Sequence, residues 1–159
     1  MAKFVLDADA AIKLTKASLI EKAAGQTKLF MSQQVYQEIL KGKEKLYEDA
    51  FYIESLVNNK KITVHRTNAD QFEGLGTGEC SALKLFKEIK GDAIISDDRK
   101  FLSLLEKESI PFIIVTDFIV FLVIKKAISK EEGLSALNKI HFLVREENYQ
   151  AAKREIEGD

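Results

Sequence analysis

The sequence predicts an α/β fold of three layers, in which a central, mostly parallel sheet of about five strands carries helices on both faces. Short runs rich in Val, Ile, Leu and Phe alternate with longer segments whose apolar residues recur at helical spacing. Parallel strands need crossover connections, usually helices, so this alternation favours a parallel sheet over a set of hairpins. A length of 159 residues with one proline is typical of a single domain, which we expect to span residues 1–159.

Five apolar runs are expected to form the strands. The first, KFVL, ends directly at an acidic residue, and the fourth, DAIIS, runs into two more. Short runs with few polar residues are typical of strands that are buried on both faces. The expected strands are residues 3–6, 28–31, 61–66, 92–96 and 111–115.

The segments between these runs carry helix signals. Ser32 is placed to cap the helix that follows it, and Gly25 and Gly42 are placed to end helices. Ser129 and Glu132 match a capping box, which predicts a helix that ends near residue 139. The other expected helices span about residues 9–24, 33–41, 44–57, 78–90, 99–108 and 146–157.

The charge balance excludes a protein that attracts nucleic acid through an overall basic field. The chain has 24 Lys and Arg against 25 Asp and Glu, with a net charge of −1. Lysines cluster around residues 41–45, 60–61 and 125–126, and we interpret these clusters as solvated surface. Any nucleic-acid site must therefore be local.

The cellular compartment is predicted from the single cysteine and the short apolar runs. Cys80 excludes an internal disulfide and fits a reducing compartment, so we expect a cytoplasmic protein. No apolar run reaches the ~18 residues that a membrane-spanning helix needs. The N-terminal segment MAKFVLDADA does not match a signal peptide.

Acidic residues gather where the predicted strands end. Asp7 ends the first strand, Asp9 lies two residues further on, and Asp97 and Asp98 end the fourth. Asp117 lies just past the fifth strand and is expected to join them. Parallel sheets bind ligands outside the carboxyl ends of their strands, so these carboxylates fall on the expected binding edge. The alternative is that each acid caps the helix that follows it.

Two glutamates lie on predicted helices. Glu79 follows the glycine-rich segment GLGTG, in the first turn of a helix, where it would also complement the helix dipole. Glu38 lies at the border of an apolar helix face, and its carboxylate either reaches water or points into a shared cleft. The glycine-rich segment lacks the pattern of a phosphate-binding P-loop.

A site made only of Asp and Glu needs cations to hold its charges together. His65 and His141 are too isolated for a zinc site, and Cys80 occupies a position suited to a small core residue. Oxygen ligands without imidazole or thiolate select Mg²⁺ or Mn²⁺. Two such ions activate a water molecule and stabilise the leaving oxygen of a phosphodiester.

The segments VLDADAAI, SQQVYQEIL, GTGECSAL and SDDRKF follow one another within residues 4–101. In this order they resemble the four motifs of the PIN domain (PilT N-terminus) nucleases, a family that includes many toxins of prokaryotic toxin–antitoxin pairs. The tail also resembles the end of such a domain. The resemblance implies a PIN-like sandwich. It assigns catalysis and metal binding to Asp7, Glu38, Glu79 and Asp98.

The remaining polar residues near these motifs are assigned supporting roles by the resemblance. Asp9 stands where the family usually has Asn, and Ser96 takes the position of a hydroxyl residue. The doubled acid leaves open whether Asp97 or Asp98 is the direct ligand. Asp9, Ser96, Asp97 and Asp117 are therefore expected to support the ligands or to add one.

The resemblance implies endonucleolytic cleavage of RNA that depends on Mg²⁺ or Mn²⁺, and frequent homodimers. A toxin would have an antitoxin partner, whereas an enzyme of RNA processing or decay would not, and the sequence leaves both roles open. One alternative is a PIN-like module that binds RNA or protein without cutting. Another is a phosphohydrolase of the haloacid-dehalogenase type with Asp7 as nucleophile, although Ala10 and Ala11 replace the Thr or Val expected after its second Asp.

Overall fold

The computed structural model describes residues 1–68 and 74–158, and these form a five-stranded sheet in the order β3-β2-β1-β4-β5. Every strand pair is parallel, with Val5 opposite Phe30 on one side and Ile94 on the other. The predicted parallel sheet is therefore confirmed. The strands are β1 (Lys3–Leu6), β2 (Lys28–Ser32), β3 (Thr63–His65), β4 (Ala93–Ile95) and β5 (Phe112–Ile113).

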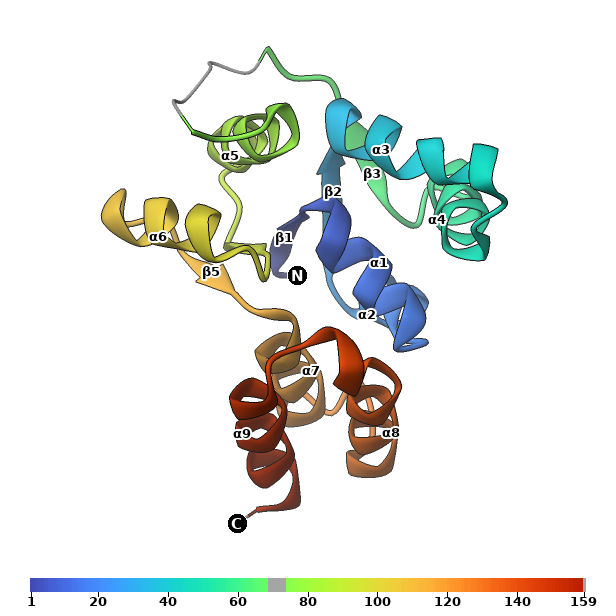
Figure 1. Ribbon diagram of the computed structural model, residues 1–159, viewed down its shortest axis with the longest axis vertical. Coiled ribbons are helices and arrows are strands. Elements are labelled where there is room, and N and C mark those ends of the chain that lie inside the picture. The colour runs from blue at the N-terminus through green and yellow to red at the C-terminus, as the bar shows by residue number, and fades with distance from the viewer. Residues whose placement is uncertain (69–73, 159) are drawn as a thin grey trace.

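Helices cover both faces of this sheet (Figure 1). In chain order the helices are α1 (Ala8–Lys16), α2 (Ile20–Gln26), α3 (Gln33–Leu40), the 3₁₀ helix η1 (Lys41–Lys45), α4 (Glu48–Asn58), α5 (Thr77–Ile89), α6 (Arg99–Lys107), α7 (Val115–Ile124), α8 (Lys130–Ile140), η2 (His141–Leu143) and α9 (Glu146–Glu157). Helices α7, α8 and α9 pack against one another at one end of the molecule. The three-layer architecture predicted from the alternation of elements is thus confirmed.

The alternation of side chains along β1 and β4 divides the core into two parts. Val5 and Ile94 pack on one face with apolar residues of α5 and α6. Phe4, Leu6 and Ile95 pack on the other face with the remaining helices. Successive strand residues point to opposite faces, so apolar runs bury both sides of the sheet at once.

The predicted helix over residues 9–24 is two helices instead of one. Helix α1 ends at Lys16, and Ser18 takes a left-handed conformation with φ 61° before α2 begins. The N–H of Ser18 bonds to the carbonyl of Thr15, and that of Leu19 bonds to Leu14, which completes the helix end. No glycine or proline lies at this break. The apolar residues keep helical spacing across it, so the sequence predicted a single helix.

Two other predicted boundaries are displaced. The chain continues from α3 through η1, and Leu46 with φ 58° then delays the start of α4 to Glu48. Strand β5 is shorter than the expected 111–115, because Val115 already belongs to α7. The apolar residues of α7 pack into the core from a helix, and their composition alone resembles a buried strand.

The strand order places a topological switch point between β1 and β4. The chain leaves β1 towards β2 on one side, and leaves β4 towards β5 on the other. Open parallel sheets bind ligands at such a point, outside the carboxyl ends of the strands. Within the described residues, no helix has the length and hydropathy to span a membrane.

Candidate active site

A cleft of about 700 Å³ opens beside the switch point. All four predicted ligands line it, although they come from elements far apart in the sequence. Asp7 and Asp98 follow the two central strands, and Glu38 and Glu79 come from α3 and α5. The acidic residues of the cleft are Asp7, Asp9, Glu38, Glu79, Asp97 and Asp98.

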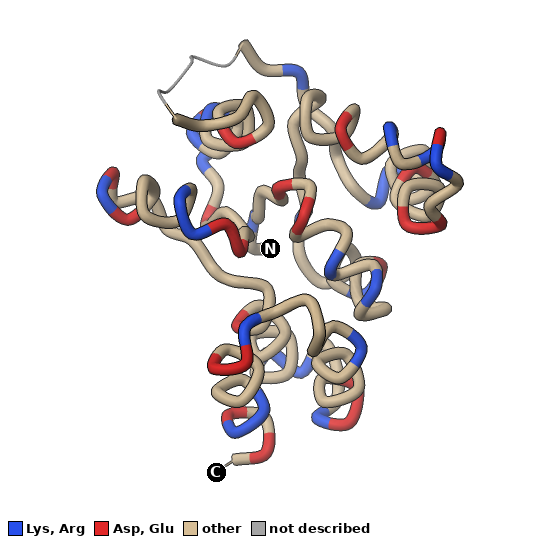
Figure 2. The backbone as a smooth tube through the Cα atoms, viewed as in Figure 1, with Lys and Arg blue, Asp and Glu red and all other residues tan. Residues whose placement is uncertain are grey.

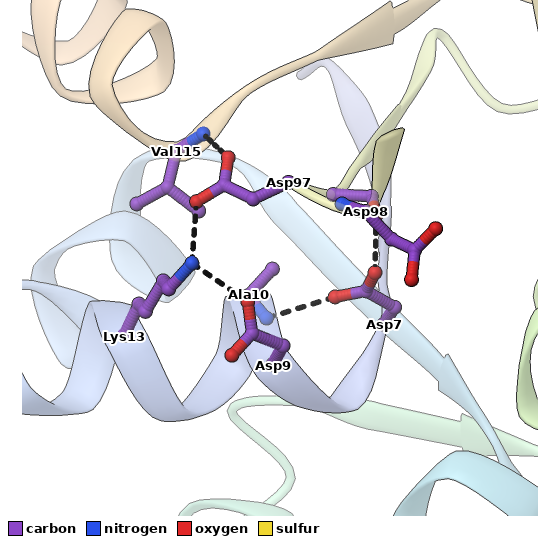
Figure 3. Close-up of polar contacts among 8 residues, drawn as sticks. Asp7, Asp9, Ala10, Lys13, Asp97, Asp98 and Val115 are labelled. Carbon is purple, nitrogen blue, oxygen red and sulfur yellow. Dashed lines mark hydrogen bonds and ion pairs between the residues drawn. The ribbon is translucent and has the colours of Figure 1, made fainter. Parts of the chain in front are cut away.

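Asp7 is a buried carboxylate, with 8% of the residue exposed. It caps α1, because Oδ1 accepts a hydrogen bond from the N–H of Ala10 at 2.8 Å, and Oδ2 accepts one from the hydroxyl of Ser96 (Figure 3). Burial raises the pKa of Asp7 from 3.8 to about 7, although both hydrogen bonds lower it. The nearby carboxylates of Asp9 and Asp97 raise it further. The rise in the pKa of Asp7 therefore comes mainly from burial, with a smaller contribution from the neighbouring acids.

Asp98 caps α6 and shares a serine with Asp7. Its Oδ1 accepts a hydrogen bond from the N–H of Phe101 at 2.9 Å, and its own N–H donates to the hydroxyl oxygen of Ser96 at 3.2 Å. Ser96 is fully buried, so it ties the end of β4 to the carboxylate that follows β1. The capping roles considered from the sequence are thus present at Asp7 and Asp98, and each uses one carboxylate oxygen.

Asp97 points away from Asp98 and has both oxygens engaged (Figure 3). One oxygen accepts a hydrogen bond from the N–H of Val115 at 2.9 Å, and the other lies 2.8 Å from Nζ of Lys13. Asp97 therefore caps α7, a helix whose own N-cap residue, Ile114, has no capping side chain. This arrangement favours a structural role for Asp97 and leaves Asp98 as the better placed ligand.

Lys13 is a charged residue of the cleft that the sequence analysis missed. Its Nζ lies 2.8 Å from Asp9 and 2.8 Å from Asp97, and its side chain is 11% exposed. Burial lowers the pKa of Lys13, but the two carboxylates raise it by more. The spacing of Asp9 and Lys13, four residues apart on a helix, was the available signal for one of these contacts. The contact with Asp97 spans 84 residues and carries no such signal.

Glu38 and Glu79 approach the cleft from two helices that are joined by serines. The buried hydroxyls of Ser32 and Ser81 lie 2.7 Å apart and connect the start of α3 to α5. Gly78 allows this approach, because a Cβ atom there would lie 3.1 Å from Oε2 of Glu38. A larger residue at this position would displace the carboxylate of Glu38 by a few tenths of an ångström.

Glu79 lies in an acidic environment. Its carboxylate accepts a hydrogen bond from the N–H of Gly76 at 3.4 Å. Partial burial raises the pKa of Glu79, and the carboxylates of Asp98 and Glu38 add to this rise. Three of the four predicted ligands thus influence one another electrostatically.

Asp117 does not join the other acids in the cleft. It lies in the first turn of α7 and is not among the residues that line the cleft. Partial burial raises the pKa of Asp117, and Glu155 and Asp97 raise it further. Asp117 was expected at the edge of the sheet because residues 111–115 were predicted to form a strand, and the early start of α7 moves it away.

The donors of the cleft suit a hard divalent cation in their chemistry. Carboxylate oxygens are the ligands that Mg²⁺ and Mn²⁺ prefer, and six acidic residues line the cleft. Among the described residues, however, no three Asp, Glu, His or Cys side chains stand close enough together to hold an ion. The acidic residues of the cleft therefore have the chemistry and the location that a divalent cation needs. They would have to move closer together to bind it.

Along the backbone, Lys and Arg positions are interspersed with Asp and Glu positions (Figure 2). Lys41, from a cluster that we interpreted as solvated surface, lines the acidic cleft together with Lys13. Positive charge is thus present in the wall of the acidic cleft, although the chain as a whole has a net charge of −1.

Comparison with known proteins assigns the family. A search of curated proteins finds no match to the chain. The family model described as DUF3368, a PIN domain, matches residues 3–158, and so spans every element described above. The parallel sheet, the acids at its switch point and this match agree with the resemblance of the four motifs, and the chain belongs to the PIN-domain family.

Proposed function

We propose that this protein is an endoribonuclease that hydrolyses RNA phosphodiester bonds with the help of Mg²⁺ or Mn²⁺. The observation that carries the proposal is the cleft at the switch point, which Asp7, Glu38, Glu79 and Asp98 line together. PIN domains are generally nucleases, so membership of the family supports the same reaction.

These four residues would hold the metal. When bound, divalent cations would activate a water molecule and neutralise charge on the phosphodiester. Asp7 holds a proton near neutral pH without a cation, and must release it to act as a ligand. Ser96 orients Asp7 by donating its hydroxyl to Oδ2.

Lys13 and the backbone set the charge of the cleft. Lys13 pairs with Asp9 and Asp97 and offsets one of their two negative charges, so these two acids repel an incoming phosphate less than free carboxylates would. The other carboxylate oxygen of Asp97 accepts a hydrogen bond from the N–H of Val115. The negative charge that is left belongs mainly to the four proposed ligands, which supports a division between ligands and supporting groups.

A second candidate is a PIN-like module that binds RNA or protein without cutting. It is favoured by one observation: within the described residues, no three acids converge on a single point. A metal-binding measurement separates the two candidates, because a module of this kind would not gather its acids around a cation.

The decisive experiment compares two kinds of phosphate ester. The enzyme should cut internal bonds of an RNA oligonucleotide in Mg²⁺ or Mn²⁺, and should leave small phosphomonoesters almost untouched. The Asp98→Asn variant, at the same folded fraction, should not cut. A phosphoaspartate trapped on Asp7 would instead support the haloacid-dehalogenase type of phosphohydrolase, and would overturn the proposal.

The proposal extends to the setting of the reaction. We expect residues 1–159 to act as one PIN-like domain, as a homodimer in the cytoplasm. A short neighbouring reading frame for a DNA-binding antitoxin would support a toxin role, and its absence would support RNA processing or decay. The mass of the protein in solution tests the homodimer.

A further inference from the structure

A small basic pocket lies behind the acidic cleft and shares a wall with it. Its volume is about 140 Å³, and Lys13 and Asp97 line both cavities. The polar residues of the pocket are Lys13, Asp97, Arg99, Thr116, Arg145 and Asn148. Because Lys13 lies against Asp97, the positive charge of the pocket comes mainly from the two arginines.

Neither arginine is neutralised in the part of the chain that the structure describes. No carboxylate among the described residues lies within ion-pair distance of Arg99 or Arg145. Glu146, the nearest acid in sequence to Arg145, accepts hydrogen bonds from Gln150 and pairs with His141. Two guanidinium groups in one pocket without a partner are suited to an anion.

Three helices begin at this pocket. Arg99 is the first residue of α6, Thr116 lies in the first turn of α7, and Arg145 and Asn148 flank the start of α9. These helices have 9, 10 and 12 residues, so each has a developed dipole with its positive end at the N-terminus. The carboxylates of Asp98 and Asp97 already cap α6 and α7, so the backbone adds to the positive field of the arginines mainly at the start of α9, which has no capping side chain.

The hydroxyl of Thr116 gives an independent indication of a ligand. Thr116 is 1% exposed, and its Oγ1 has no hydrogen-bond partner among the described residues. A buried hydroxyl without a partner is costly, so such a group in the wall of a pocket indicates an absent acceptor. A phosphate oxygen is an acceptor of this kind.

We propose that this pocket binds a phosphate group of the RNA substrate, next to the phosphodiester that lies at the carboxylates. The inference rests on the proposed function for its substrate. A volume of about 140 Å³ corresponds to roughly five water molecules at ~30 Å³ each, which suits a phosphate with some water. It is well below the ~300 Å³ at which small-molecule pockets begin, so a nucleoside would not enter.

Because the pocket shares a wall with the acidic cleft, a phosphate bound in it would determine which phosphodiester of the RNA lies at the acids. The phosphate would be held by Arg99, Arg145 and Thr116, while the ion pair with Lys13 offsets the charge of Asp97 in the same wall. Two sources supply the same chemistry: an internal phosphate of the RNA backbone, or a 5′-terminal phosphate. Both are recognised by arginine and by helix N-termini.

The first experiment measures binding without catalysis. Inorganic phosphate is titrated into the metal-chelated protein at constant ionic strength, and the backbone amide signals of Thr116 and Asn148 are followed by NMR. We expect these signals to shift, and Arg145→Gln to weaken phosphate binding roughly ten-fold. Arg154→Gln is the matched control, because it removes the same charge from an exposed position of α9 outside the pocket.

A second variant excludes a merely structural explanation. Thr116→Val removes the unpartnered hydroxyl at nearly constant volume, so it should leave the protein as stable as before or more stable. It should nevertheless weaken phosphate binding several-fold. Unshifted signals in the wild type, or equal phosphate binding by Arg145→Gln and Arg154→Gln, would overturn the pocket assignment.

Cleavage assays identify the source of the phosphate. KM and kcat are measured for one RNA with either a 5′-phosphate or a 5′-hydroxyl. If Arg145→Gln raises KM for both RNAs, the pocket binds an internal phosphate, and if it only removes a preference for the phosphorylated end, it binds the terminal one. Cleavage without phosphate binding would overturn the pocket alone, whereas phosphate binding without any cleavage would overturn the nuclease function alone.

Discussion

Nζ of Lys13 lies 2.8 Å from Oδ2 of Asp97, in an ion pair that joins helix α1 to the end of strand β4. The other oxygen of Asp97 accepts a hydrogen bond from the N–H of Val115, at the start of α7. One carboxylate thus connects three elements that are distant in the sequence. The neighbouring Asp98 makes no such connection and faces the cleft.

Replacement of Asp97 and replacement of Asp98 should reduce RNA cleavage to different extents. Asp98→Asn should abolish cleavage that depends on metal, because it removes a proposed ligand. Asp97→Asn should keep measurable cleavage in Mn²⁺, with a loss of about 10–100-fold, as is typical of groups that orient a ligand. It should also destabilise the fold by about 1–3 kcal/mol, because it weakens a charged hydrogen bond.

The comparison requires equal folded fractions, measured by denaturant titration. Relief of acid repulsion could offset part of either loss of stability, so rates alone are insufficient. If Asp97→Asn were inactive and Asp98→Asn cut normally, the ligand assignment would have to move to Asp97.

Lys13→Met should destabilise the protein by about 2–3 kcal/mol, measured as the free energy of unfolding in denaturant. Removing the cation leaves Asp97 partly buried without its charged partner, and such a loss is costly. Lys16→Met is the matched control on the same helix, because its ion pair with Asp49 involves a lysine side chain that is 43% exposed. The control should change stability by less than ~1 kcal/mol. Equal effects of the two variants would contradict the role given to Lys13.

The stability of the metal-free protein should fall as pH rises from about 4 to about 7. Asp7 has a pKa of about 7 in the folded state against 3.8 when unperturbed, so the folded state binds its proton more tightly. Its contribution is therefore complete below pH ~4 and is lost as the pH passes through ~7, and about 4 kcal/mol is at stake. Asp7→Asn should flatten this part of the profile, measured by denaturation in a chelator at each pH. An identical profile for the variant would contradict the raised pKa.

Mn²⁺ should stabilise the wild-type protein. If only the folded state gathers the four acids, a concentration of ~100 times the dissociation constant adds about 2.7 kcal/mol, measured as a rise in Tm. The double variant Asp7→Asn with Asp98→Asn should lose this response. A wild-type Tm that is unchanged by Mn²⁺ would favour the module that binds without cutting.

Gly78→Ala should reduce cleavage far more than stability. The added methyl group would lie 3.1 Å from Oε2 of Glu38, so the carboxylate must move by a few tenths of an ångström or more. We expect a loss of up to ~100-fold in kcat/KM from this displacement, with a stability change below ~1 kcal/mol. Gly25→Ala is the control, because nothing lies within 4 Å of its added Cβ, and it should keep full activity.

The sequence predicted the parts of the fold that depend on local pattern. The strand ahead of Asp7, the cap at Ser32 and the capping box at Ser129 all rest on neighbouring residues, and the structure contains each of them. The break at Ser18 has no local signal, since a serine in the left-handed region is held there by backbone bonds at the end of α1. The backbone bonds that end α1, and not a glycine or proline, therefore form this boundary.

The candidate site was predictable to the extent that strand ends share an edge. Asp7 and Asp98 could be placed together from that rule, and the motif resemblance added Glu38 and Glu79. The partners of Asp97 could not be found in this way. Lys13 and Val115 reach it across 84 and 18 residues, and their contacts depend on how α1 and α7 pack.

The buried serines link the four acids in two pairs. Ser96 binds the carboxylate of Asp7 and the backbone of Asp98, while the hydroxyl pair of Ser32 and Ser81 holds together the helices that carry Glu38 and Glu79. A cation bound by all four acids would therefore change mainly the distance between the two pairs. Its affinity would depend on three buried serines, Ser32, Ser81 and Ser96, that are not ligands themselves.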